Sequence, residues 1–148
     1  MTINIRPYRQ SDIQQVLEIF RLNTPAYFDP SEESGLTKYL EEKGNYFYVA
    51  IKDSSIIGGG GYDLPINQHH GMLSWYFVHP NVYGQGVGTA LVKQNMSLVR
   101  KASYIHKLIV RTSQFAFLFF EKHGFETVEV KKDYWAKGYD LYFMKMDL

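Results

Sequence analysis

The residues best suited to chemistry form a glycine-rich stretch in the middle of the chain, Tyr83-Gly84-Gln85-Gly86-Val87-Gly88-Thr89-Ala90-Leu91. Three glycines within five positions leave the main chain of one turn open to a ligand. The stretch follows an apolar run at 72–78 and opens a segment with helical periodicity, and the first amides of a helix have no partner within it. Such amides bind phosphate groups. The stretch therefore predicts a phosphate-binding turn between a strand and a helix.

Two other nucleotide-binding motifs fit this turn less well. The P-loop ends in Gly-Lys-Ser/Thr, whereas here Gly88 is followed by Thr89 and Ala90. The dinucleotide motif Gly-x-Gly-x-x-Gly would begin at Gly84, but its third glycine is replaced by Thr89, and the motif belongs after an early strand. Neither a nucleoside triphosphate nor a dinucleotide is therefore the expected ligand.

Hydrophobic periodicity predicts the elements that must position the turn. Strands are expected at 2–6, 46–51, 56–63, 72–78, 108–110, 125–130 and 139–146, and helices at about 11–20, 31–44, 84–102 and 115–124. This order indicates an α/β fold, a mixed sheet of about seven strands flanked by about four helices. The strand before the glycine turn and the strand after its helix are expected to be parallel neighbours.

Local patterns predict three details of these elements. Ser11-x-x-Gln14 matches a capping box at the start of the first helix. Ser31 is expected to cap the second helix, which Gly44 ends. The glycines at 58–61 fit either a bulge with close backbone approach inside a strand or a flexible loop.

Length and composition narrow the class of protein. The chain has 148 residues, enough for one core, so a single domain over 1–148 is expected. A formal net charge of +1 disfavours nucleic acid as the main partner. The sequence has no cysteine, and residues 1–7 contain no apolar stretch of signal or membrane-spanning length. We therefore expect a cytoplasmic protein with no membrane partner and no metal site.

Two segments carry a family resemblance. The segment from Val78 to Leu91 resembles the acetyl-CoA signature of the GCN5-related N-acetyltransferases, Arg/Gln-x-x-Gly-x-Gly/Ala. The segment Ala116-Phe117-Leu118-Phe119-Phe120-Glu121-Lys122-His123-Gly124-Phe125 resembles their second signature, Ala-x-x-Phe-Tyr-Glu-Lys-x-Gly-Phe. The order of elements matches that family over essentially the whole chain. The resemblance implies an acyl-CoA N-acyltransferase fold. It also implies transfer of an acetyl group from acetyl-CoA to a primary amine of a small molecule or peptide, by direct attack in a ternary complex.

The resemblance also implies which residues contact coenzyme A. Amides of Gln85 to Thr89 would hold the pyrophosphate, and the main chain of Phe77 and Val78 would bind the pantetheine arm. Tyr83 stands where the signature has Arg or Gln, so one side-chain contact to phosphate is weakened or is replaced by a hydroxyl. The full expected set is Phe77, Val78, Tyr83, Gly84, Gln85, Gly86, Val87, Gly88, Thr89, Ser113, Phe120 and Lys122.

The expected catalytic positions are Ser74, Ser113 and Phe120. Phe120 occupies the position of the family tyrosine that often protonates the departing thiolate, and it has no proton to give. Ser113, where the family often has asparagine, or a bound water could serve instead. For the base, Ser74 could hold a water, and His69 and His70 have a suitable pKa range, so the sequence leaves the base open.

Two segments are expected to recognise the acceptor, 23–29 and 133–140. Within them Tyr27, Phe28, Trp135 and Asp140 would contact the amine, because aromatic faces with a nearby carboxylate suit a cation. Because of Phe120, an alternative stays open: a coenzyme A-binding domain with little or no catalysis, acting as a sensor or assembly partner. Homodimers are common among such proteins, so a homodimer is a further possibility.

Overall fold

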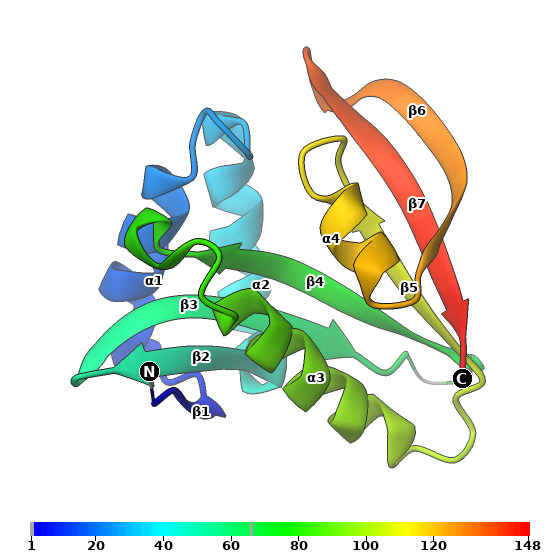
Figure 1. Cartoon of the computed structure of the whole chain (residues 1–148), viewed down its shortest axis with the longest axis horizontal. Coiled ribbons are helices and arrows are strands. Elements are labelled where there is room, and N and C mark those ends of the chain that lie inside the picture. The colour runs from blue at the N-terminus through cyan, green and yellow to red at the C-terminus, as the bar shows by residue number, and fades with distance from the viewer. Residues whose placement is uncertain (1, 66) are drawn as a thin grey trace.

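A seven-stranded mixed sheet forms the centre of the protein (Figure 1). The computed structural model describes residues 2–65 and 67–148. The strands are β1 (Asn4–Pro7), β2 (Phe47–Lys52), β3 (Ser55–Asp63), β4 (His70–Val78), β5 (Lys107–Thr112), β6 (Glu126–Ala136) and β7 (Tyr139–Asp147). Their order across the sheet is β1-β2-β3-β4-β5-β7-β6. The predicted strand number and mixed α/β class are confirmed.

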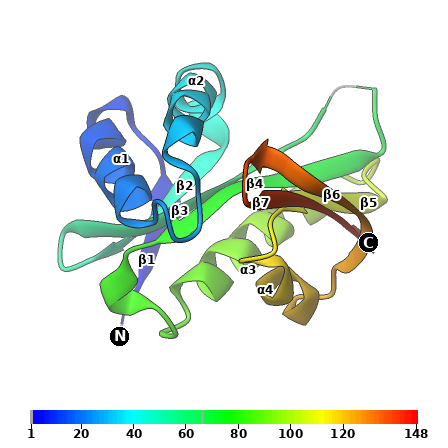
Figure 2. The ribbon, with the colours of Figure 1, turned by 90° about the horizontal axis from the view of Figure 1, so that it is seen from above.

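Four α-helices cover the two faces of this sheet within the described residues. They are α1 (Ile13–Leu22), α2 (Glu33–Lys43), α3 (Val87–Arg100) and α4 (Phe117–Lys122). Figure 2 shows α1 and α2 on one face and α3 and α4 on the other. The first face buries an aromatic-rich cluster that includes Phe20, Phe47 and Phe77, and the second buries Leu108, Val110 and Phe120 among others. Burial of these two apolar layers stabilises the fold.

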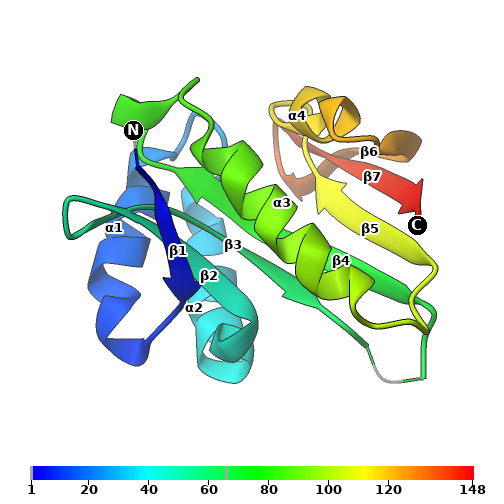
Figure 3. The same cartoon turned by 60° about the horizontal axis from the view of Figure 1, so that its bottom comes forward.

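The parallel strands β4 and β5 separate partway along their length. They pair from His70 with Lys107 as far as Leu73 with Val110, and β4 then continues to Val78 without β5 beside it. Figure 3 shows the two strands side by side at their N-terminal ends and apart at their C-terminal ends. This confirms the predicted parallel pair and creates a fork in the middle of the sheet, which we call the β4–β5 fork.

A β-bulge lies in β4 immediately after the fork opens. Gly59 pairs with Phe77 and Gly61 with Ser74, so Trp75 and Tyr76 together oppose Gly60. Trp75 has a φ of 62°, a strained conformation for a non-glycine residue that costs about 1–3 kcal/mol. The glycine run lies inside strand β3 and not in a loop, but the extra residue of the bulge is in β4. The approach to the glycines is made by side chains, because the rings of Phe47, Tyr76 and Tyr39 lie where side chains at positions 59, 60 and 61 would lie.

The residues at the N-terminal ends of α1 and α2 do not act as the caps predicted from the sequence. α1 follows a short 3-10 turn at Gln10–Asp12 that contains Ser11, and the Asp12 carboxylate accepts from Arg9 N, at the start of that turn, at 2.8 Å. Before α2, Asp29 accepts from Ser31 N at 2.9 Å, so Ser31 is capped and is not itself the cap. The prediction for Ser11 was wrong because Ser11 lies inside the 3-10 turn that precedes α1. The prediction for Ser31 was wrong because the Asp29 carboxylate caps this turn and accepts more strongly than a hydroxyl.

Candidate active site

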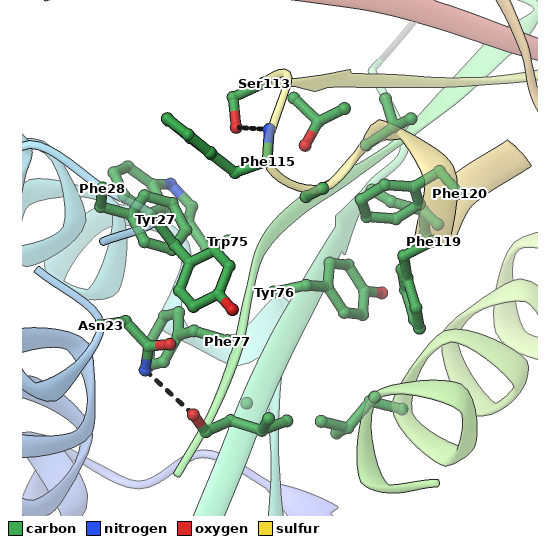
Figure 4. Close-up of a pocket in the computed structure, with 18 of the residues that line it drawn as sticks. Asn23, Tyr27, Phe28, Trp75, Tyr76, Phe77, Ser113, Phe115, Phe119 and Phe120 are labelled. Atoms are coloured by element: carbon green, nitrogen blue, oxygen red, sulfur yellow. Dashed lines mark hydrogen bonds between the residues drawn. The ribbon is translucent and has the colours of Figure 1, made fainter. Parts of the chain in front are cut away.

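A cleft of about 670 Å³ occupies the β4–β5 fork (Figure 4). Its walls come from the α1–α2 loop, β4, the glycine turn, α3, the end of β5, α4 and the β6–β7 hairpin. Among the predicted site residues it is lined by Ser74, Ser113, Phe120, Phe77, Val78, Tyr83, Gly84, Gly86, Val87, Gly88, Thr89, Lys122, Tyr27, Phe28 and Trp135. The fold therefore brings both predicted signatures and most of the predicted acceptor residues to one cavity.

The glycine turn presents unpaired amides at one end of this cleft. Gly84 and Gly86 have φ values of 77° and 85°, a left-handed conformation that favours glycine. The first bond within α3 runs from Ala90 N to Gly86 O at 3.0 Å, so the amides of residues 87–89 precede the helical ladder. Gln85 N instead donates to Val82 O at 3.2 Å, and Gln85 does not line the cleft. The amides that are open to an anion at this turn are therefore those of Gly86 to Thr89, and the Gln85 amide is not one of them.

Two α4 side chains lie beside this turn. Lys122 lines the cleft, and His123 Nε2 lies 3.3 Å from the Thr89 hydroxyl. Burial and the nearby Lys122 and Lys93 lower the pKa of His123 below its usual range. A neutral His123 can therefore orient Thr89, while Lys122 supplies positive charge.

The hydroxyl of Tyr83 is hydrogen-bonded within the protein. Its O–H donates to Asn23 Oδ1, and Asn23 Nδ2 donates to Ile19 O and to Val78 O, each at 2.9 Å. The Tyr83 hydroxyl is thus already engaged, and its contact with phosphate stays a prediction. Tyr83 instead joins Asn23 in fixing the end of α1 to the exposed edge of β4, the contact drawn in Figure 4.

Phe77 and Val78, at the end of β4, direct their main-chain N–H and C=O groups to opposite sides of the strand. His79 N donates to Ile57 O at 2.8 Å, toward β3. Because successive residues of a strand alternate, the Val78 N–H and C=O point away from β3 and into the fork, where Asn23 reaches the carbonyl. The Phe77 carbonyl lies 3.2 Å from a Cβ placed on Gly58 and faces β3. Val78 can therefore offer its amide to a ligand, whereas Phe77 lines the cleft with its side chain.

Phe120 is buried, with 3% of its surface exposed, and its ring packs edge-on against Tyr76 at 5.9 Å between centroids. Tyr76 was not predicted from the sequence, although it lines the cleft. Its hydroxyl accepts from Asn95 Nδ2 at 2.7 Å, and burial raises the pKa of Tyr76 above its usual range. A tyrosine hydroxyl that stays protonated at neutral pH is thus present beside the position where the family tyrosine is missing.

The two predicted serines occupy the two arms of the fork. Ser113 is buried and stabilises the turn before α4, since its Oγ accepts from Phe115 N at 3.2 Å and its carbonyl accepts from Phe117 N at 3.0 Å. Its hydroxyl proton remains available to a ligand. Ser74 is the first residue of β4 after the last pair with β5. Both serines line the cleft, and their catalytic roles stay predictions.

The opposite end of the cleft is aromatic, and we call it the aromatic end, formed by Tyr27, Phe28, Trp75, Trp135 and Tyr139. Asp140 is not part of its lining. Its Oδ1 accepts from Asp133 N at 2.9 Å and its own amide donates to Gln114 Oε1 at 2.8 Å. Asp140 therefore shapes the β6–β7 hairpin, and the carboxylate expected at this end must come from elsewhere.

Glu32 supplies that carboxylate. It is the one acidic side chain among the described residues that line the cleft. Burial raises the pKa of Glu32, although a hydrogen bond from Asp29 N at 2.9 Å acts in the opposite direction. The Asp29-x-x-Glu32 spacing, which forms a capping box, was the signal in the sequence that could have found it.

Aromatic rings from four segments cross the mouth of the cleft. Tyr27 contacts Tyr83 edge-on at 5.7 Å and Phe115 at 6.5 Å, and Phe115 contacts Tyr139 at 5.8 Å between centroids. The Tyr139 hydroxyl donates to Pro25 O at 2.5 Å. The α1–α2 loop is thereby joined to the β6–β7 hairpin, which narrows access to the cleft.

His69 and His70 lie at the other end of β4. His69 stacks on His106 and its Nδ1 lies 3.1 Å from Tyr104 O. Neither His69 nor His70 lines the cleft. Among residues 2–65 and 67–148, no three side chains of His, Cys, Asp or Glu gather as a metal site would require. None of the helices in the described part of the chain has the length and apolar character needed to cross a bilayer.

Comparison with known proteins gives a consistent picture. Residues 16–148 match the model of the acetyltransferase (GNAT) domain. An N-alpha-acetyltransferase of Saccharolobus solfataricus is 32% identical, over 97% of this chain and 92% of that protein. The crystal structure of Ard1 from Thermoplasma volcanium has a TM-score of 0.84 at 18% identity, covering 100% and 99% of the two chains. PaiA N-acetyltransferase from Thermoplasma acidophilum, in complex with coenzyme A, has a TM-score of 0.74 at 17% identity and covers both chains fully.

A mixed sheet forked beside a glycine turn defines an acyl-CoA N-acyltransferase fold, as its solved neighbours confirm. The match over 16–148 is to the GNAT model, so the chain belongs to the GCN5-related N-acetyltransferase family. It is an N-acetyltransferase. The family resemblance and the enzyme class predicted from the two signatures are confirmed.

Proposed function

We propose that residues 1–148 act as one domain that transfers an acetyl group from acetyl-CoA to the amino group at a peptide N-terminus. The observation that carries this proposal is the cleft itself, which runs from the unpaired amides of the glycine turn, through the β4–β5 fork, to the aromatic end. The N-alpha-acetyltransferase relative from S. solfataricus supports a peptide amine as acceptor. The ring contacts across the mouth favour a slender chain end over a lysine on a folded surface.

The glycine turn would bind the pyrophosphate of the cofactor. The amides of Gly86 to Thr89 would donate to phosphate oxygens, and Lys122 would add charge from the other wall. The dipole of α3 would contribute roughly 0.3–2 kcal/mol. The Val78 amide would bind the pantetheine arm or the thioester oxygen, because at the fork β5 no longer lies beside this part of β4.

Acetyl transfer at the fork requires that the amine be deprotonated, the oxyanion stabilised and the thiolate protonated. The α-ammonium group of a peptide has a pKa of about 7.7–8.0 and is mostly protonated at neutral pH, so a base must take one proton before the nitrogen attacks the thioester carbon. Glu32, or a water held at Ser74, would take it. The Val78 amide would stabilise the oxyanion. When the carbon–sulfur bond breaks, the thiolate would receive a proton from Ser113, Tyr76 or water, because Phe120 has none to give. The second proton lost by the attacking nitrogen would replace the one that this group gives to the thiolate.

The second candidate function is that of a coenzyme A-binding domain with little or no catalysis. It is favoured by Phe120, whose ring is buried at the position of the family tyrosine. It predicts that acetyl-CoA raises the thermal midpoint while no amine releases free thiol. A general acid contributes about 10²–10⁴-fold, so loss of one such group slows the reaction without abolishing it.

Thiol release from acetyl-CoA with a panel of N-terminal peptides tests the proposal. We expect turnover with the native enzyme, and a loss of about 10²-fold or more in Glu32→Gln with unchanged coenzyme A affinity. Glutamine can still accept from Asp29 N, so the cap persists. Glu33→Gln is the matched control, because Glu33 pairs with Arg21 at 2.8 Å and does not line the cleft. Equal turnover in native enzyme and Glu32→Gln would exclude Glu32 as the base. Binding without turnover on any peptide would support the second candidate function.

A further inference from the structure

Arg111 is a cation in the cleft that the reaction steps above do not use. It follows Val110, the last residue of β5 that pairs with β4, and it lines the cleft. Leu108 and Val110 point into the core under α3 and α4. Because side chains alternate along a strand, Arg111 points to the opposite face, which carries α1 and α2. Its guanidinium therefore lies on the acceptor side of the sheet.

Two aromatic rings hold this guanidinium in place. Arg111 Cζ lies 5.3 Å from the ring centroid of Tyr134 and 5.8 Å from that of Trp135, and Trp135 belongs to the aromatic end. Arg111 Nη2 donates to the Tyr134 hydroxyl at 2.5 Å, and Trp135 Nε1 donates to Thr112 O at 3.1 Å. Such cation–π contacts orient the planar guanidinium without neutralising its charge.

Arg111 has no counter-ion among the residues that the structure describes. Of the ion pairs formed by residues 2–65 and 67–148, none includes Arg111. A guanidinium has five N–H donors, and only one is bonded to another described side chain. The nearest acids of the hairpin are occupied, since Asp133 accepts from Gly138 N at 2.7 Å and Asp140 accepts from Asp133 N. The donors of Arg111 are thus free for an anionic group entering the cleft.

The same cleft contains the opposite charge on Glu32, and the two residues are not within ion-pair distance of each other. A ligand with an ammonium group near Glu32 and a carboxylate near Arg111 would complement both. We propose that Arg111 binds a carboxylate carried by the acceptor close to its amino group, so that acidic acceptors are preferred. This inference rests on the proposed acetyl transfer and specifies its substrate class.

The carboxylate could belong to an acidic side chain near a peptide N-terminus or to a free amino acid. The experiment measures kcat/KM for two matched pairs: amidated peptides that begin Ser-Glu or Ser-Gln, and an amino acid beside its amide. With native enzyme we expect kcat/KM to be about tenfold higher for the acidic member of one pair than for its neutral partner. The pair that shows this preference tells whether the carboxylate belongs to a peptide side chain or to a free amino acid. The preference should fall as salt is raised, because a half-exposed ion pair is screened.

Arg111→Met keeps an unbranched apolar side chain and removes the charge. We expect the preference to fall to about one in Arg111→Met and to persist in part in Arg111→Lys. Lys131→Met is the control, because Lys131 also lies over the Tyr134 ring, at 5.9 Å, without lining the cleft. It should keep the full preference.

Three results would overturn the inference. They are equal rates on both members of both pairs, a preference that is insensitive to salt, and a preference retained in Arg111→Met. If Arg111→Met does not fold, the salt dependence of the native enzyme and the Arg111→Lys ratio decide. Transfer without charge preference overturns this inference alone. Absence of transfer to any amine overturns the proposed function as well.

Discussion

Substitution of Gly86 by alanine tests the glycine turn most directly. Gly86 is the N-cap of α3 with a φ of 85°, and a Cβ added there meets nothing within 4 Å. In the folded protein the cost is therefore backbone strain, about 1–2 kcal/mol for a left-handed alanine. For a protein of this size that corresponds to a thermal midpoint lower by about 2–8 °C. The open space in front of the turn, however, is where the pyrophosphate would lie.

Gly138 provides a matched control for this strain. It also has a φ of 85° and open space at its Cβ position, but it lies in the β6–β7 turn and does not line the cleft. Gly138→Ala should lower the thermal midpoint by a similar amount. Only Gly86→Ala should weaken coenzyme A binding, because its methyl group displaces phosphate from the amides.

Calorimetric titration with coenzyme A measures this difference. Loss of one hydrogen bond to a charged group costs about 1.5–3 kcal/mol, so we expect Kd to rise about 10- to 100-fold in Gly86→Ala. Gly138→Ala should keep the native Kd. Native affinity in a folded Gly86→Ala protein, or an equal loss in both variants, would refute the assignment of the turn as the pyrophosphate site.

Two further predictions concern stability and are measured by urea denaturation. A Cβ on Gly59 would lie 2.5 Å from the fully buried ring of Phe47, whereas one on Gly35, within α2, would meet Trp75 at 3.6 Å. Gly59→Ala should therefore lower the free energy of unfolding by about 1–3 kcal/mol or more, and Gly35→Ala should raise it by about 0.5–1 kcal/mol. A change of the same sign in both variants would contradict this packing. The hydrogen-bonded Arg6 guanidinium holds the pKa of Asp12 below its usual value, so this stabilisation is present above pH about 4 and is lost as pH falls through the folded pKa. Asp12→Asn should thus be less stable than the native protein at pH 7 by about 1–3 kcal/mol, with a smaller difference at pH 3, and a difference that grows in acid would contradict this sign.

The sequence by itself determined the family, the order of the elements and the position of the glycine turn. These features are local, because a strand, a turn with positive φ and a helix are each encoded by residues close together in the chain. The glycines at 84 and 86 are required by the φ values of the turn whatever surrounds them. The caps predicted at Ser11 and Ser31 were local too, but each serine lies inside a 3-10 turn whose start is fixed by a neighbouring carboxylate, that of Asp12 or Asp29.

Only the tertiary structure decided which side chains complete the site. Tyr83 meets Asn23 across sixty positions, and Tyr139 meets Pro25 across 114. Glu32 and Arg111 lie on separate elements, and the sheet order places both at one cleft. Periodicity reports which face of an element is buried, but it does not report which element lies opposite. The partners of a buried or cleft-facing polar group are therefore set by packing between distant segments.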